Sequence, residues 1–270
     1  MISENLKQEI IKYYLSQPMT LQQIKDKYNL SLPTISKILE NVPKYTKAKI
    51  YNPNMDEYFF HTIESEESAY FLGLIIADGN VFKEITGKGR QASISITLDL
   101  KDEYMLNNFK KAVKSNTSVG HDGRGCGQIA VRSNIMAQDL SQYGVIPKKT
   151  FCAYLPIVDA KWMPHLIRGI LDGDGNISGH MAPNNNFYHS IGFCGTHELM
   201  QNIASYLSEN LKLQKKLTVY DYKNRLLSEV KIQNKHDMYL VGEWLYKDAT
   251  IFLTRKKEIY DCFKEHYNLN

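Results

Sequence analysis

The hydrophobic pattern of the chain changes its period several times between residues 69 and 143. An almost wholly apolar run, AYFLGLIIADGNVF, is followed by stretches that alternate with period two and by stretches with apolar residues at helical spacing. Period two is typical of a strand with one buried face, and helical spacing is typical of an amphipathic helix. The order predicts a buried helix, then strand 93–98, helix 102–114, strand 128–132 and helix 134–143, with a less defined strand between Val119 and Gly127.

The same order recurs in the second half of the chain, after the run LIRGILDGDGNIS at residues 166–178. Asp78 and Asp174 occupy matching places in the two runs, too far apart for a solenoid repeat and suitably spaced for two half-domains. The second copy predicts strand 190–193, helix 197–210, strands 216–222 and 229–233, and helix 236–246. We therefore expect an α+β fold of two pseudo-symmetric αββαββα half-domains, residues 65–155 and 156–270.

The predicted strands place apolar residues on one face of each sheet and polar residues on the other. Antiparallel sheets of this kind back onto helices and leave one face uncovered. Two such faces predict a polar saddle, which suits a DNA groove, although solvent would also accept it. The residues expected on this face are Ser95, Thr97, Arg132, Lys231 and Gln233.

Small residues four apart mark both apolar runs, Gly73 and Ala77 in the first, Gly169 and Gly173 in the second. Residues four apart lie on one face of a helix, and small ones let two helices approach closer than the usual 8–10 Å. We therefore expect the two motif helices to pack against each other between the half-domains.

Each motif helix is expected to end in Asp-Gly, with the glycine as a left-handed cap. A carboxylate in the last turn meets the negative end of the helix dipole, and two carboxylates at adjacent ends repel each other. Divalent cations with oxygen ligands would offset both effects. The alternative is that Asp-Gly-Asn is only a turn, but its occurrence in both copies favours a site at Asp78 and Asp174.

FLGLIIADG and IRGILDGDG resemble the two motifs of the LAGLIDADG homing endonucleases, and the similarity covers about residues 65–265. The stretches LSQYGVIPKKT and LYKDATIFLTRKKEIY, which close the two halves, also resemble the family. The resemblance implies a site-specific DNA endonuclease that binds Mg²⁺ or Mn²⁺ through Asp78 and Asp174, assisted by the carbonyls of Ala77 and Gly173. The first motif departs from the family pattern at Ile76, where the name-giving sequence has its earlier aspartate.

The resemblance also implies a catalytic lysine on a strand, which here is Lys231, with Arg132 as its counterpart in the first half. An arginine does not readily lose its proton, so its role would be electrostatic. The alternative for both residues is a phosphate contact without a catalytic role.

The N-terminal segment carries the positive charge of the chain. Residues 1–50 contain eight lysines and four acidic residues, which accounts for the whole net charge of +4. Helices 3–16, 21–28 and 32–41, the last two capped by Thr20 and Ser31, resemble a helix-turn-helix over residues 1–42, followed by a linker at 43–64. A purely structural three-helix cap is the alternative. The residues expected to lie near DNA are Ser31, Thr34, Ser36 and Lys37.

Composition excludes several other classes of protein. The four cysteines are far apart, with no zinc spacing, and no apolar run reaches membrane-spanning length. P-loop, GxSxG, dinucleotide and HExxH motifs are absent from the sequence. We expect a cytoplasmic monomer with double-stranded DNA as its partner, encoded by an intron or a phage. A non-cleaving transcriptional regulator on the same fold is the alternative function.

Overall fold

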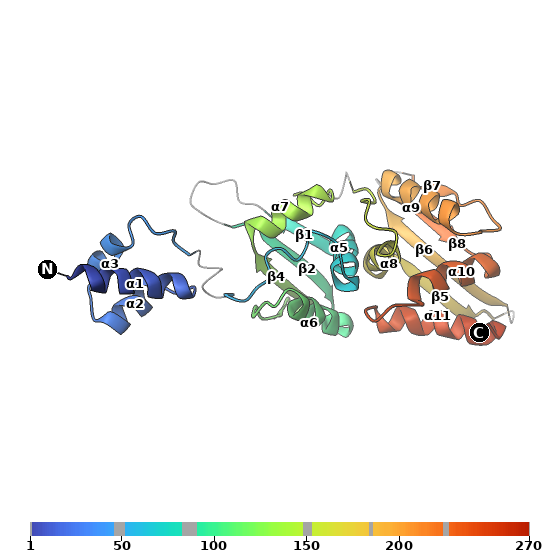
Figure 1. The fold of residues 1–270 in the computed structure, drawn as a ribbon. Coiled ribbons are helices and arrows are strands. Elements are labelled where there is room, and N and C mark those ends of the chain that lie inside the picture. The colour runs from blue at the N-terminus through green and yellow to red at the C-terminus, as the bar shows by residue number, and fades with distance from the viewer. Residues whose placement is uncertain are drawn as a thin grey trace. The chain divides into compact units, whose positions relative to one another are not determined.

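The computed structural model describes residues 2–45, 52–82, 91–147, 153–183, 186–223 and 227–269 (Figure 1). Two compact units are present, one formed by Met1–Asp56 with Lys114–Thr117 and the other by Glu57–Val113 with Ser118–Asn270. The predicted linker at 43–64 includes residues 46–51, which lie outside the described ranges. The structure therefore places the two half-domains in one unit and the N-terminal helices in another.

The N-terminal helices are α1 (Glu4–Ser16), α2 (Leu21–Tyr28) and α3 (Leu32–Ile38). Thr20 and Ser31 cap α2 and α3 as predicted; Thr20 forms a capping box with Gln23, and Asn29, at the end of α2, is left-handed with φ 49°. Their shared core includes Ile10, Tyr14, Ile24, Ile35 and Leu39. The predicted extension of α3 to residue 41 is wrong. Pro43 disfavours helical backbone at the residue before it, and the helix has already ended in a cap at Leu39.

The first half-domain begins with α5 (Glu66–Asp78), capped by Ser65. An antiparallel sheet follows in the order β1-β2-β4-β3, with helices α6 and α7 inserted after its second and last strands. The strands are β1 (Gly79–Phe82), β2 (Ser93–Asp99), β3 (Gly120–His121) and β4 (Cys126–Arg132), and the helices are α6 (Glu103–Ala112) and α7 (Asn134–Gln142).

The second half-domain repeats this topology, with α8 (Met163–Asp174) and a sheet in the order β5-β6-β8-β7. Its strands are β5 (Asn176–Met181), β6 (Phe187–Gly195), β7 (Val219–Asp221) and β8 (Ser228–Ile232), and its other helices are α9 (His197–Asn210), α10 (Lys235–Tyr246) and α11 (Thr254–Tyr267). The matching strand orders confirm the α+β, pseudo-symmetric fold.

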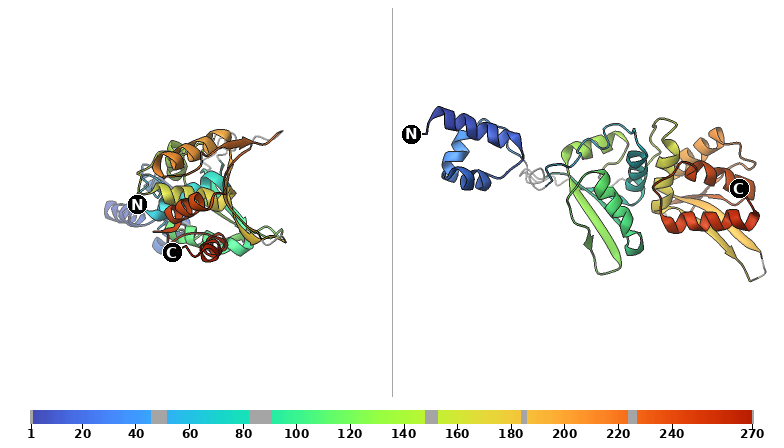
Figure 2. Two further views of the ribbon diagram at one scale, coloured as in Figure 1. Left: turned by 90° about the vertical axis from the view of Figure 1, so that its right-hand side faces the viewer. Right: turned by 60° about the horizontal axis from the view of Figure 1, so that its bottom comes forward.

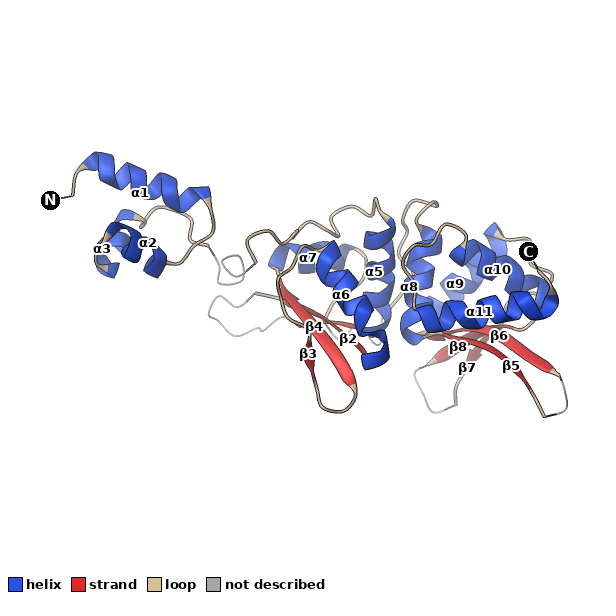
Figure 3. Ribbon diagram, turned by 90° about the horizontal axis from the view of Figure 1, so that it is seen from below, coloured by secondary structure: helices blue, strands red, loops and turns tan. Residues whose placement is uncertain are grey.

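Helices cover one face of each sheet and leave the other face open, as Figure 3 shows from below and Figure 2 from the side. The buried positions alternate along the strands, for example Ile94, Ile96 and Leu98 in β2. In the second sheet Ile177, Ile191 and Val230 are buried in the same way. Each sheet therefore has the predicted arrangement, with its apolar face against the helices and its polar face open to solvent.

Three details differ from the predictions. The first strands of the two halves, β1 and β5, follow the motif helices at residues for which no strand range was predicted, and α11 adds a helix beyond the expected αββαββα order. The expected left-handed caps are wrong, because Gly79 (φ −82°, ψ 157°) and Gly175 (φ −89°, ψ 177°) are extended. Glycine is needed there for space. A Cβ on Gly79 would lie 2.6 Å from the Cα of Ile75, since the strand folds back onto the last turn of the helix.

Cys126, Cys194 and Cys262 are free thiols, while Cys152 lies outside the described residues. No helix within the described ranges combines the length and apolar character needed to cross a membrane.

Candidate active site

The motif helices α5 and α8 pack backbone against backbone. A Cβ on Gly73 would overlap the carbonyl oxygen of Leu166, and a Cβ on Gly169 would overlap the carbonyl oxygen of Tyr70. A Cβ on Gly173 would overlap that of Ala77. These contacts advance together along both helices, so the helices run in the same direction with their C-terminal ends side by side. The predicted small-residue interface is confirmed.

This packing brings the two motif acids to the same end of the helix pair. A Cβ on Gly173 would lie 3.3 Å from Oδ2 of Asp78 and 3.5 Å from its backbone nitrogen. Gly173 directly precedes Asp174 in the last turn of α8. Asp78 is half-buried and Asp174 is exposed, so one carboxylate is set into the interface and the other faces solvent.

The earlier acid of the second motif, Asp172, has a different environment. Its side chain is buried, and Oδ2 accepts hydrogen bonds from the Tyr70 hydroxyl and the Leu253 amide, each at 2.8 Å. Burial raises the pKa of Asp172 to about 6, against the effect of the nearby Lys256 charge. Asp172 therefore joins the helices internally, which explains why the first motif can have the apolar Ile76 at this place.

Lys231 lies in the sheet row closest to the second motif acid. It is paired across β8 and β6 with Gly192, which is paired with Asn176 of β5, two residues after Asp174. Two strand spacings, about 10 Å, separate the backbone of Lys231 from that of Asn176, and the lysine side chain is exposed.

Arg132 is not the counterpart of Lys231 in the first half. The equivalent row runs from Asn80, two residues after Asp78, through Ser95 to Ala130. Arg132 pairs with Ser93 instead, one step further along the strand, and is thus about 7 Å beyond the matching position. The predicted equivalence is wrong, because alternation identifies a strand face and leaves the register open by two residues.

The remaining predicted sheet residues all lie on the uncovered faces. Ser95 and Thr97 project from β2, and the Thr97 hydroxyl accepts a hydrogen bond of 2.9 Å from Nε2 of Gln128. Gln233 is exposed just beyond the end of β8. Neither Arg132 nor Lys231 forms an ion pair with another residue in the described part of the chain. Both cations are therefore accessible to a polyanion.

Solved structures of LAGLIDADG meganucleases and homing endonucleases have a similar architecture. The structure of I-AabMI bound to uncleaved DNA matches with a TM-score of 0.53 at 14% identity, covering 74% of this chain and 90% of that one. The structure of I-SmaMI bound to cleaved DNA matches with a TM-score of 0.53 at 12% identity, covering 77% of this chain and 92% of that one. The structure of I-GzeII in complex with its DNA target matches with a TM-score of 0.53 at 13% identity, covering 75% of this chain and 92% of that one.

This chain has the LAGLIDADG homing-endonuclease fold. No family model and no curated protein matches its sequence. The likeness to these structures is therefore one of fold, at 12–14% sequence identity.

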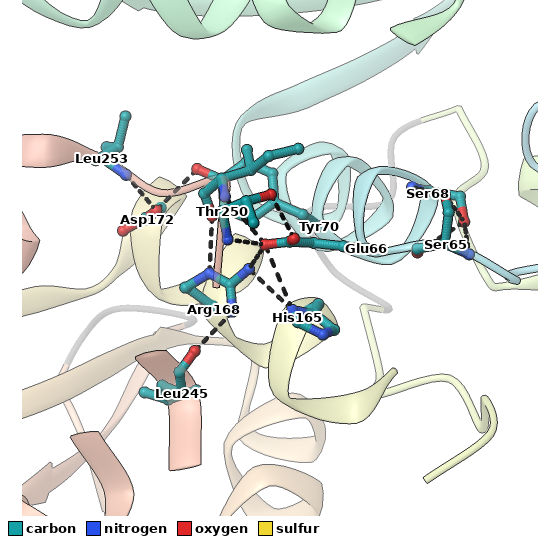
Figure 4. Close-up of polar contacts among 11 residues, drawn as sticks. Ser65, Glu66, Ser68, Tyr70, His165, Arg168, Asp172, Leu245, Thr250 and Leu253 are labelled. Atoms are coloured by element: carbon teal, nitrogen blue, oxygen red, sulfur yellow. Dashed lines mark hydrogen bonds and ion pairs between the residues drawn. The ribbon is translucent and has the colours of Figure 1, made fainter. Parts of the chain in front are cut away.

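A buried polar network holds the LAGLIDADG helices in register (Figure 4). Arg168, fully buried in α8, donates to a Glu66 carboxylate oxygen at 2.5 Å and to the carbonyls of Leu245 and Ile251. Glu66 also accepts from the backbone and hydroxyl of Thr250. Burial opposes ionisation of Glu66, but these hydrogen bonds and the Arg168 charge lower its pKa overall.

The predictions from sequence missed these network residues. Arg168 and Asp172 are charged residues four apart inside an apolar helix, which was a detectable signal of buried partners. Lys256 was a second signal, because it shares helical spacing with the buried Tyr260 and Phe263 of α11. Their partners could not be identified, since they lie far away in the sequence.

The N-terminal unit presents the predicted contact residues on and beside α3. Ser31 and Lys37 are exposed, whereas Thr34 and Ser36 are half-buried. The Ser31 hydroxyl bonds to Thr34 Oγ1 at 2.8 Å and caps the helix, so both hydroxyls also have local structural roles.

Proposed function

We propose that this protein is a site-specific, metal-dependent DNA endonuclease that makes a double-strand break. The observation that carries the proposal is the placement of Asp78 and Asp174 at adjacent helix ends, next to two open polar sheet faces. The fold neighbours support it, because I-AabMI, I-SmaMI and I-GzeII were each solved with DNA.

The residues at the helix ends fit a hard divalent cation. The missing side chain of Gly173 lets the two helix ends approach closely, since a Cβ there would lie 3.3 Å from Asp78 Oδ2. Within the described ranges no cluster of three or more His, Cys, Asp or Glu side chains is found. Two carboxylates with the carbonyls of Ala77 and Gly173, completed by water and phosphate oxygens, form a donor set that Mg²⁺ or Mn²⁺ accepts.

When bound, the metal would lower the pKa of a water molecule and offset negative charge on the phosphate. Asp78 and Asp174 would hold the metal at the helix ends, where it would offset their charge and that of the scissile phosphates. Lys231 would stabilise negative charge developing on the strand nearer the second half-domain. Ala130 supplies no such charge, so the two DNA strands would meet different electrostatic environments.

The sheet faces and the helix-turn-helix would supply target recognition. Ser95, Thr97 and Gln233 offer hydrogen-bonding groups to base edges and phosphates, and Arg132 offers a phosphate contact. Because both half-domains occur in one chain and differ in sequence, we expect a monomer acting on an asymmetric site. A homing role, for a gene within an intron or a phage, follows from the same proposal.

The test begins with selection of bound sequences from a randomised double-stranded DNA library in Ca²⁺. Selected duplexes are then incubated with Mg²⁺ or Mn²⁺ and wild-type protein, Asp78→Asn, Asp174→Asn or Asp248→Asn. Asp248 is an exposed control near His165, at the opposite end of α8. Loss of cleavage in the two motif variants alone, with binding retained, is expected.

A transcriptional regulator is the second candidate, favoured by the separate N-terminal unit of three helices with its own core. It predicts tight, specific binding by the wild type without cleavage in either metal, unchanged by both motif substitutions. Failure to enrich any DNA sequence would contradict both candidates.

A further inference from the structure

A buried lysine lies under the last turn of α8. Lys256, in the first turn of α11, is 2% exposed. Its ammonium donates to three carbonyl oxygens, those of Leu171 at 2.6 Å, Asp172 at 2.8 Å and Gly175 at 2.7 Å. A lysine ammonium has three hydrogens, so its donor capacity is fully used.

The three carbonyls bracket the candidate metal-binding residues. Leu171 and Asp172 directly precede Gly173 and Asp174, and Gly175 directly follows them. Carbonyls in the last turn of a helix have few partners within the helix, and among these three that of Leu171 also accepts from the Gly175 amide at 2.9 Å. Here one side chain from another helix binds the carbonyls on both sides of the Gly173–Asp174 pair.

The charge of Lys256 is costly to bury, which indicates that it has a role beyond filling space. Burial lowers the pKa of Lys256 to about 8, while the charges of Asp172, Asp78 and Asp102 act in the opposite direction. The Lys256 ammonium itself lies at the end of α8, where it binds the carbonyls of Leu171 and Asp172. The positive charge of Lys256 also offsets the negative end of the α8 dipole, near which the two motif acids lie.

We propose that Lys256 is a positioning residue, which holds the end of α8 so that Asp174 and the Gly173 carbonyl face Asp78. This inference rests on the proposed nuclease function. Lys256 touches backbone carbonyls and does not reach the DNA itself, so it would affect the chemical step more than DNA affinity.

The first test is hydrogen exchange of the full-length, metal-free protein, which does not depend on activity. Lys256→Met is compared with wild type and with Tyr260→Phe, a matched control on the same helix that loses hydrogen bonds to Tyr239 and Glu243. Peptides covering residues 171–176 are expected to exchange at least about tenfold faster in Lys256→Met only, because their carbonyl anchor is gone.

The second test is single-turnover cleavage, well below the melting temperature of every variant. Lys256→Met is expected to cleave at least about tenfold more slowly, with DNA affinity in Ca²⁺ changed less than about twofold. Lys256→Gln, which keeps two donors, is expected to lie between it and wild type, and replaces it if Lys256→Met does not fold.

Cleavage and exchange equal to those of Tyr260→Phe would overturn the positioning role. A slower rate that follows only the loss of stability, with unchanged exchange at 171–176, would also overturn it. If the wild type binds DNA without cleaving, the nuclease proposal fails, and the exchange result alone then decides whether Lys256 orders the end of α8.

Discussion

Replacing Gly73 with alanine is expected to destabilise the interface between the motif helices, because the interface has no room for one methyl group. The added Cβ would overlap the Leu166 carbonyl oxygen and lie 3.0 Å from the Ile170 nitrogen and the Leu166 carbonyl carbon. These are backbone atoms, so no change of rotamer relieves the overlap. Non-bonded atoms pack at about 3.5 Å, so the helices would have to separate by about 1 Å or more.

Two opposing effects determine the magnitude. Alanine is favoured over glycine inside a helix by about 1 kcal/mol. Overpacking a core typically costs about 1–3 kcal/mol, and a clash between backbones belongs at or above the upper end of that range. We expect a net loss of about 2 kcal/mol, equivalent to a melting temperature lower by roughly 4–8 °C for a chain of this size.

The assay is thermal and urea unfolding followed by tryptophan fluorescence. The chain has two tryptophans, and both belong to the second half-domain, Trp162 at the start of α8 and Trp244 in α10. The control is Gly120→Ala, where a Cβ would meet only the Gln128 carbonyl oxygen at 3.9 Å. Its unfolding free energy should change by less than about 0.5 kcal/mol.

Gly169→Ala provides an internal check, because its Cβ would overlap the Tyr70 carbonyl across the same interface. Once one methyl group has separated the helices, the second causes less overlap. The double variant should therefore lose less unfolding free energy than the sum of the losses in the two single variants. A Gly73→Ala protein that melts at or above the wild-type temperature would refute the close-packing argument.

Further predictions concern charge and capping. Lys231→Met should slow cleavage of one DNA strand at least about tenfold more than the other on doubly labelled duplexes, because Ala130 takes the matching position in the first half; equal slowing would contradict the assigned register. The pKa of Glu66 is lowered from 4.5, so its stabilising effect is complete above that pH and is lost as the pH falls through the lower folded value. Urea unfolding of Glu66→Gln from pH 3 to 7 should therefore differ from wild type most at neutral pH, and a difference that grows toward acid would be inconsistent with this sign. Arg168→Met should lose about 3–5 kcal/mol of unfolding free energy, because it leaves Glu66 without its buried cation; a neutral result in the same assay would show that packing compensates for the charge. Thr20→Ala should cost the N-terminal unit about 1 kcal/mol, seen as faster amide exchange in α2, while tryptophan-detected unfolding stays unchanged.

The sequence by itself determined the duplicated architecture, the motif helices and the strand faces. These features depend on neighbours in the chain. Alternation in β2 defines a buried face, and Gly73 with Ala77, four residues apart, defines a helix surface on which backbones can meet. Caps such as Ser65 and Thr20 were predictable for the same reason, since their partners are three residues away.

Tertiary structure alone decided the register of the strands and the buried partners of the motif helices. A shift of two residues keeps every side chain on the same face, so the pattern in the sequence could not distinguish Ala130 from Arg132 as the counterpart of Lys231. The contacts of Lys256 with α8 join residues more than 80 positions apart. Contacts over such distances depend on how the helices and the 250–256 segment pack together, and no local periodicity encodes that arrangement.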